Sequence, residues 1–315
     1  MRKLMVAAAA LAIGLSGGLA MAAPSAPLIE RTKFFGNPSR VAGRLSPDGK
    51  WLAFIAPRDG MLNVWVAPTA EPDKARPLTA EKVRPIRAYY WSPDSRRILF
   101  VNDKGGDENF LLYGVDVASG AQSTLTPFEK TRVQVLNISR LVKDRILVGL
   151  NNRDPRWHDV YSLDLASGKL TLIYQNEGFG GFDIDEQLQI RSGSRPRPDG
   201  GVDIYAFEGG KPSDKPTESI GFEDSDGTGP IGFSNDGTIA YWRESRDRDT
   251  SAIVARDLKT GARTVIAQSP KADIDHLMAS PLTGRVDAYS VNYLTNEWTA
   301  LDPALKADFD FLKAN

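Results

Sequence analysis

The sequence holds one serine in a pattern typical of a hydrolase nucleophile. Residues 14–18 read Gly-Leu-Ser-Gly-Gly, which fits Gly-x-Ser-x-Gly. In an active hydrolase this pattern follows a strand, opens a helix and is completed by a carboxylate and a histidine further along the chain. Here it lies inside an apolar N-terminal run of the secretory-signal type. We therefore expect the serine to be removed with that segment rather than to act in catalysis.

The two histidines, His158 and His276, are the candidates for the base of a Ser-His-Asp site. His158 precedes Asp159, but adjacent strand residues point to opposite faces of a sheet. His276 has Asp275 beside it, and no nucleophile stands in a suitable pattern nearby. We expect the chain to carry no catalytic residue and not to be an enzyme on its own.

The residue composition also argues against a metal site. Two histidines and no cysteines make a zinc site improbable. Acidic stretches at residues 183–186 and 223–227 could attract calcium, but this ion needs six to eight oxygens and usually a fixed loop pattern, which neither stretch matches. We read both as solvated loops and expect no metal and no other cofactor.

Two recurring turns organise the chain around these residues. Residues 46–49, 92–95 and 234–237 read Ser-Pro-Asp-Gly, Ser-Pro-Asp-Ser and Ser-Asn-Asp-Gly, and each precedes an apolar run. A second turn, Ala-Ser-Gly or Lys-Thr-Gly, follows strands that end in aspartate, at residues 118–120, 166–168 and 259–261. Proline, aspartate and glycine favour tight turns, and the apolar runs favour buried strands. Alternating turns of two types predict a repeating antiparallel sheet.

The repeat predicts an all-β fold, a β-propeller of four-stranded antiparallel blades. Third strands are centred near Trp65, Tyr113, Tyr161 and Tyr205, a spacing of about 44 to 48 residues that is typical of propeller blades. A sandwich or barrel predicts no such period. Six units are recognisable, and the sixth stops after its second strand. A ring that is open, or seven-bladed at full length, fits this pattern. Aromatic strand residues are expected between blades: Trp51, Phe54, Trp91, Phe100 and Trp242.

Blade geometry separates two faces of this propeller. The two recurring turns emerge at one end of the strands, and the connections from second to third strands emerge at the other. Those connections, at residues 58–60, 103–109, 151–158, 195–201 and 243–249, are dense in charged and amide side chains, and such loops often carry recognition. The alternative is a merely solvated surface with weak ion pairs. Candidates for contact with a substrate or partner domain are Asp107, Glu108, Asn109, Asp154, Arg156, His158, Arg195, Arg197, Arg246 and Arg248.

Composition and the N-terminus indicate an exported protein. Of 315 residues, 39 are lysine or arginine and 40 are aspartate or glutamate, so the net charge of −1 argues against a nucleic-acid partner. A basic start, an apolar run and small residues predict a signal peptide at residues 1–22. Without cysteine there is no lipid anchor, so we expect a periplasmic or secreted chain with no membrane attachment after cleavage. The further segments are a lead-in at 23–38, the propeller at 39–302 and a C-terminal helix at 303–315.

Several stretches resemble a known family. They are Asn-Asp-Lys-Gly-Gly-Asp-Glu-Asn from residue 102, Asn-Asn-Arg-Asp-Pro-Arg-Trp-His-Asp from residue 151, Asn-Glu-Gly-Phe from residue 176, and Trp-Thr-Ala-Leu-Asp from residue 298 before a helix. Together they resemble the N-terminal propeller of exported bacterial prolyl-oligopeptidase-family (S9) serine peptidases, of the dipeptidyl-aminopeptidase and acylaminoacyl-peptidase type. The resemblance covers nearly everything from Phe34 onward.

The resemblance implies a partner domain. In that family the propeller covers the active site of an α/β-hydrolase domain and admits only short or unstructured peptides. The catalytic serine, aspartate and histidine would follow Asn315, so none is carried over, and we expect this chain to be part of a longer protein. The predicted function is therefore the gating and selection of short peptides. The alternative left open by the sequence is a free-standing periplasmic scaffold like the TolB propeller.

Overall fold

The computed structural model describes residues 27–315. The chain divides into two compact units, residues 1–37 and 38–315. In the first unit, helix α1 (Arg31–Phe35) is a single turn, which ends where the Gly36 N–H donates to the Thr32 carbonyl at 2.9 Å. The signal peptide predicted for residues 1–22 lies outside the described residues.

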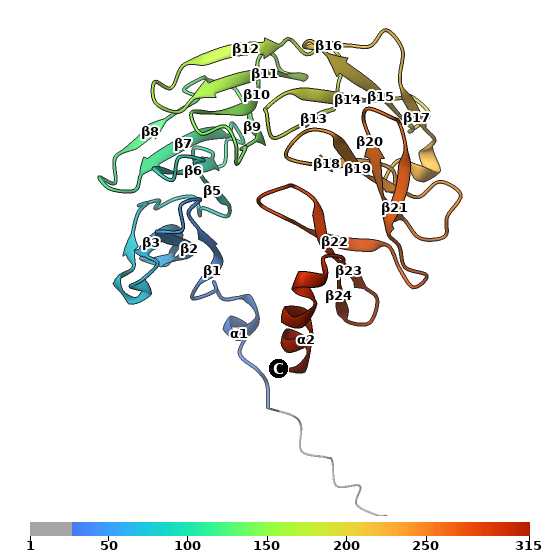
Figure 1. Cartoon of the computed structure of the whole chain (residues 1–315). Coiled ribbons are helices and arrows are strands. Elements are labelled where there is room, and N and C mark those ends of the chain that lie inside the picture. Colours follow the sequence, from blue (N-terminus) through green and yellow to red (C-terminus); the bar gives the residue numbers. More distant parts are fainter. Residues whose placement is uncertain (1–26) are drawn as a thin grey trace, which may run out of the picture. The chain divides into compact units, whose positions relative to one another are not determined.

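The second unit consists of six antiparallel sheets that follow one another along the chain (Figure 1). Each sheet is one blade, as the repeat predicted. The strands of the first three blades are β1 (Val41–Leu45), β2 (Trp51–Arg58), β3 (Met61–Pro68), β4 (Arg76–Pro77); β5 (Tyr89–Trp91), β6 (Arg97–Asn102), β7 (Leu111–Asp116), β8 (Gln122–Thr124); and β9 (Val133–Asn137), β10 (Arg145–Asp154), β11 (Trp157–Asp164), β12 (Leu170–Tyr174).

The last three blades are less regular. Their strands are β13 (Gly181–Ile184), β14 (Ile190–Pro196), β15 (Val202–Glu208), β16 (Lys211–Pro212), β17 (Glu218–Ile220); β18 (Gly229–Phe233), β19 (Ile239–Glu244), β20 (Ala252–Asp257), β21 (Arg263–Ala267); and β22 (Ile274–Ala279), β23 (Val286–Asn292), β24 (Asn296–Ala300). In blade four the outer strand is split, because β16 and β17 pair with opposite ends of β15.

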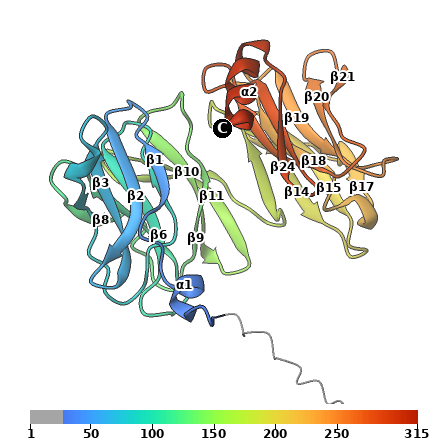
Figure 2. The ribbon, with the colours of Figure 1, turned by 90° about the horizontal axis from the view of Figure 1, so that it is seen from below.

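The prediction for the sixth unit was wrong in one respect. It stopped after two strands, whereas β24 pairs with β23 as a third. Most of β24 is exposed, so its sequence lacks the apolar signal that marks the other strands. The helix predicted next is present: the Asp302 carboxylate accepts the Ala304 N–H at 2.8 Å, and α2 (Lys306–Ala314) follows. Figure 2 shows α2 beside β24, where Phe309 stacks on Trp298.

Five clusters of buried side chains hold the blades together, and each joins one blade to the next. Ala53 packs with Ile98, Leu99 with Ile146, Leu147 with Ile190, Ile204 with Trp242, and Ile253 with Ile274. Four of the five aromatic residues expected in the core are buried there or beside it, and Trp51 is partly buried against the first cluster. Removal of this apolar surface from water is the main force that stacks the blades.

The three serine turns are closed by the same pair of hydrogen bonds. The Ser46 hydroxyl donates to the Asp48 carboxylate at 2.6 Å and accepts the Trp51 N–H at 3.0 Å, so one buried oxygen closes the turn. The same pair of contacts recurs at Ser92 and at Ser234. A short local motif thus starts the second strand of three blades.

Hydrogen bonds between neighbouring blades repeat with the period of the sequence. The Tyr89 hydroxyl donates to the Ala42 carbonyl at 2.7 Å, and the Asn137 amide donates to the Ile184 carbonyl at 3.0 Å. In both pairs the partners are 47 residues apart. The spacing read from the sequence is therefore the spacing of equivalent positions in adjacent blades.

Candidate functional site

The connections from second to third strands form one end of the propeller, which we call the loop face. It comprises residues 59–60, 103–110, 155–156, 197–201, 245–251 and 293–295. The opposite end, the turn face, carries the serine turns and the Ala-Ser-Gly and Lys-Thr-Gly turns. Because all blade strands are antiparallel, every second-to-third connection emerges at the loop face.

Three of the predicted loop-face arginines are held by carboxylates of their own surroundings. The contacts are Arg156–Asp154 at 2.7 Å, Arg197–Asp199 at 2.7 Å, and Arg246–Glu244 at 2.6 Å with Arg246–Glu218 at 3.0 Å. Hydrogen bonds from Arg156 lower the pKa of Asp154 to about 2, and those from Arg197 do the same to Asp199. These arginines stabilise their loops and are not free to bind a ligand carboxylate without losing a partner.

Arg195 is positioned in a different way from these three arginines. Its guanidinium carbon lies 4.6 Å from the centre of the Phe179 ring and 4.9 Å from that of Tyr205. It makes no ion pair with any residue of the part of the chain that is described. Stacking on two rings fixes the plane of the guanidinium while its N–H groups keep their hydrogen-bonding capacity. Arg195 is thus an oriented, exposed cation.

The platform beneath Arg195 is rigid for a local reason. The Asn176 amide donates to the Phe179 carbonyl at 2.8 Å, and its oxygen accepts the Phe179 N–H at 2.8 Å. Gly193 gives Phe179 its space, since a Cβ there would stand 2.7 Å from the ring. The hydrogen bonds of its backbone to Asn176 and the close packing against Gly193 therefore fix the position of the Phe179 ring.

A small cavity of about 80 Å³ adjoins this platform. Arg156, Trp157, His158, Asn176 and Phe179 are among the residues that line it. The Nε2 atom of His158 is buried and has no hydrogen-bond partner among the described residues. Burial is the main cause that lowers the pKa of His158, so the imidazole is neutral at pH 7. The cavity is large enough for a water molecule.

Asp159, which the sequence placed beside His158, serves another purpose. Its buried carboxylate receives both Arg153 Nε and Arg153 Nη2, at 2.7 and 2.8 Å, and accepts the Asn176 N–H at 2.8 Å. It thereby holds the turn that carries Phe179. Sequence reasoning missed this anchor. A comparison of the repeats could have found it. Asn63 holds the same position in the third strand of blade one, and its side-chain oxygen also accepts a backbone N–H, that of Glu81, at 2.8 Å.

The remaining predicted residues lie on other blades. Asp107 accepts the N–H groups of Lys104 and Asn109 at 3.2 and 3.1 Å and so shapes its own loop. Glu108 adopts a positive φ of 58° in the same loop. Arg248 in blade five donates to the Gln268 amide oxygen at 3.3 Å. Asp107 and Asn109 line one cavity of about 470 Å³, Arg246 and Arg248 line another of about 380 Å³, and Arg156 and His158 line the small cavity beside Phe179, on which Arg195 stacks.

The comparisons with known proteins agree with this architecture. No protein-family model matches the chain. It is 42% identical over 320 residues to dipeptidyl aminopeptidase BIII of Pseudoxanthomonas mexicana, a match that covers 99% of this chain and 46% of that protein. A match of this identity and extent makes the chain a homologue of part of that peptidase.

Two further relatives extend the comparison. Dipeptidyl peptidase family member 6 of Caenorhabditis elegans is 26% identical over 300 residues, which cover 90% of this chain and 40% of that protein. The β-propeller domain of the Trilobed protease from Pyrococcus furiosus superposes with a TM-score of 0.51 at 18% identity, over 84% of this chain and 82% of that one, and shares the fold. The chain spans less than half the length of these two sequence relatives.

Neither histidine of the chain forms a Ser-His-Asp arrangement with described residues. His276 Nδ1 lies 2.9 Å from the neighbouring Asp275 carboxylate at an exposed position, and Ser290 accepts only the His276 backbone N–H. Within residues 27–315 no group of three or more metal-binding side chains comes together. In the same range, no helix has the length and apolar character needed to cross a membrane.

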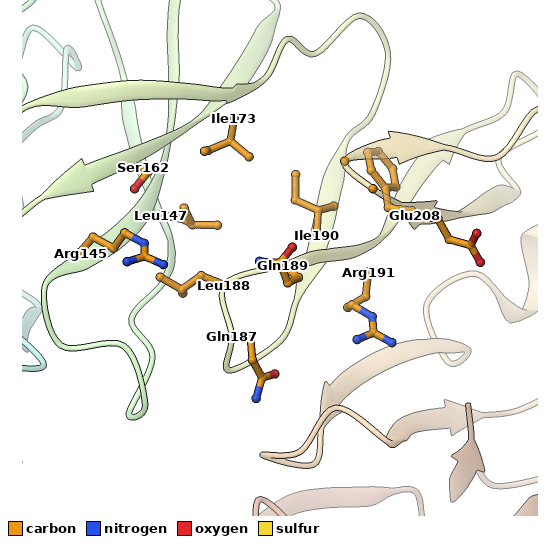
Figure 3. A pocket seen from close by; sticks show the side chains of 13 residues that line it. Arg145, Leu147, Ser162, Ile173, Gln187, Leu188, Gln189, Ile190, Arg191 and Glu208 are labelled. Carbon is orange, nitrogen blue, oxygen red and sulfur yellow. The ribbon is translucent and has the colours of Figure 1, made fainter. Parts of the chain in front are cut away.

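Two further cavities lie at the turn face, which the sequence did not single out. One cavity of about 450 Å³ lies between blades three and four, and its apolar lining includes Leu147 and Ile190 (Figure 3). Arg145 and Arg191 stand at its sides, but both are already paired, with Asp144 and Asp185. Another, of about 710 Å³, lies at the ends of the innermost strands.

Proposed function

We propose that this chain is the non-catalytic propeller of a secreted serine peptidase, where it gates and selects short peptides for an α/β-hydrolase domain. The observation that carries the proposal is the 42% identity to a dipeptidyl aminopeptidase over 99% of the chain. A propeller offers a rigid ring of loops from which a neighbouring active site can be screened.

The loop face supplies the chemistry for such selection. Arg195 presents a guanidinium that is already oriented by Phe179 and Tyr205, so a carboxylate can bind it in a bidentate manner at a small entropic cost. That carboxylate belongs either to a peptide or to the surface of the hydrolase domain.

Export is part of the proposal. The basic start, the apolar run and the small residues before Ala23 have the order of a secretory signal. A mature chain without cysteine needs no oxidative folding and suits a periplasm or an extracellular medium.

One experiment separates this function from the scaffold alternative. The protein from its native host is labelled with a fluorophosphonate, which reacts with activated serines, and its intact mass is measured. A labelled species of roughly twice 34.4 kDa is expected, because the chain covers 46% of its peptidase relative. An unlabelled, folded product close to 34.4 kDa, less any signal, would overturn the proposal in favour of a free-standing scaffold.

A further inference from the structure

The cavity of about 710 Å³ lies at the turn face, where the innermost strands end. It is bordered by the ends of β1 and β5 and by the turn after β9, together with a turn of blade six. The lining includes Arg44, Leu45, Trp91, Ile138, Arg140, Leu141, Lys143 and Leu282. It is at the opposite end of the strands from Arg195, so the two sites are independent.

The charged side chains that line this cavity are all cationic. Arg44, Arg140 and Lys143 contribute, and no aspartate or glutamate is among the lining residues. None of the three forms an ion pair with a residue of the described part of the chain. Two acids lie close by: Asp144 pairs with Arg145 at 3.0 Å, and Glu186 accepts the Arg140 backbone N–H at 2.8 Å without forming an ion pair with the Arg140 side chain. Cations gathered around a concavity attract and hold anions.

The rest of the wall is apolar and part of it is fixed. The Trp91 indole N–H donates to the Arg44 carbonyl at 3.1 Å, which sets the ring in place. Leu45, Leu141 and Leu282 are 58%, 49% and 87% exposed, although large apolar side chains gain free energy when covered. The cavity therefore suits a ligand that combines an anionic group with an apolar body.

We propose that this cavity binds the C-terminus of a peptide, with the terminal carboxylate among Arg44, Arg140 and Lys143 and an apolar last side chain against Trp91 and the leucines. The proposal rests on the proposed function in one respect, namely that the ligands are peptides. Charge complementarity argues for a carboxylate, since three cationic side chains and no acidic one line the cavity while the chain as a whole has a net charge of −1. The volume lies within the usual range of small-ligand sites.

Calorimetry with a matched pair of peptides tests the proposal. The full chain is titrated with N-acetyl-Ala-Leu-Leu as the free acid and as the C-terminal amide. The acid is expected to bind at least about tenfold more tightly than the amide, with an affinity that falls as salt rises. Equal binding of acid and amide, or no binding of the acid, overturns the proposal.

Charge-removal variants locate the binding. The double variant Arg140→Gln/Lys143→Gln is expected to weaken binding of the acid at least about fivefold. Lys169→Gln removes an exposed cation from another turn of the same face and is expected to leave the affinity unchanged. An unaffected double variant that melts at the wild-type temperature overturns the assignment.

A second copy of the chain is the competing occupant. Sedimentation that shows a concentration-dependent dimer, abolished by Arg140→Gln/Lys143→Gln, would assign the cavity to self-association and overturn the peptide proposal. The outcome is also separable from the proposed function. Fluorophosphonate labelling does not involve this cavity, so either result can fail while the other stands.

Discussion

The guanidinium carbon of Arg195 lies 4.6 Å from the centre of the Phe179 ring, and Phe179 is itself almost fully buried. The exposed cation is thus positioned by the core between blades three and four rather than by its own loop. A group positioned in this way keeps one geometry whether or not a ligand is present. This distinguishes Arg195 from Arg156 and Arg197, whose positions depend on carboxylates that a ligand would have to displace.

Arg195→Gln is expected to impair peptide selection without unfolding the propeller. In the full-length native protein, kcat/KM for short peptides should fall about fivefold, mainly through KM, because one charge-assisted contact is lost. Arg195→Lys should give an intermediate loss, since an ammonium group lacks the planar fork.

The matched control for this prediction is Lys211→Gln, which removes an exposed cation from the same blade. Kinetic constants equal to wild type are expected for it. If Arg195→Gln and Lys211→Gln behave alike, Arg195 has no role in binding peptides or in placing the hydrolase domain.

The buried carboxyl of Asp183 predicts a pH-dependent stability. Burial raises its pKa from 3.8 to about 6, against the hydrogen bond that Ser192 donates at 2.5 Å. Between about pH 4 and pH 6 the unfolded chain releases this proton while the folded chain keeps it. The free energy of unfolding therefore falls as pH rises through this window, by about 2–3 kcal/mol in total.

Asp183→Asn removes this effect and keeps an oxygen for Ser192. It is expected to match wild type at pH 4 and to be more stable at pH 7.5 by about 1–3 kcal/mol. Urea denaturation at both pH values measures the difference. A difference that does not change with pH would show that Asp183 ionises as readily in the folded state as in the unfolded one.

The serine turns give a prediction about folding. Ser92 is fully buried, donates to Asp94 and accepts the Arg97 N–H at 2.9 Å. Ser92→Ala leaves that N–H without a partner and leaves the Asp94 carboxylate with the Arg96 N–H alone, so a loss of about 1–2 kcal/mol in the free energy of unfolding is expected. Ser119→Ala in an exposed turn loses contacts that water can replace and should cost less than about 0.5 kcal/mol. Equal costs would contradict a special role for the buried hydroxyl.

The sequence predicted those parts of the fold whose signals are local. The turn that starts with Ser46 closes within six residues, and the blade period recurs as bonds between residues 47 apart. By contrast, β24 is exposed and its apolar signal is weak, so it was missed.

The site was only partly predictable, because its contacts join distant positions. Arg246 pairs with Glu218 from another blade, and Asp159 binds Arg153 rather than its neighbour His158. The stack of Arg195 on Tyr205 depends on the register that sets Gly193 opposite Tyr205. Residue types on the loops can be read from a sequence, but their partners depend on tertiary structure.

That register makes Gly193 a test of the whole platform. A Cβ at Gly193 would stand 2.7 Å from Cδ1 of Phe179 and 3.1 Å from Cε2 of Phe207, so Gly193→Ala must displace a buried ring. Such overpacking is expected to cost about 1–3 kcal/mol in the free energy of unfolding, measured in urea. It should also raise KM for short peptides, as Arg195→Gln does, because the cation moves with the ring. Gly221→Ala, where nothing lies within 4 Å of the added atom, is the matched control and should leave both quantities unchanged. A Gly193→Ala protein that is destabilised but keeps its KM would separate the platform from peptide selection and leave Phe179 with a structural role alone.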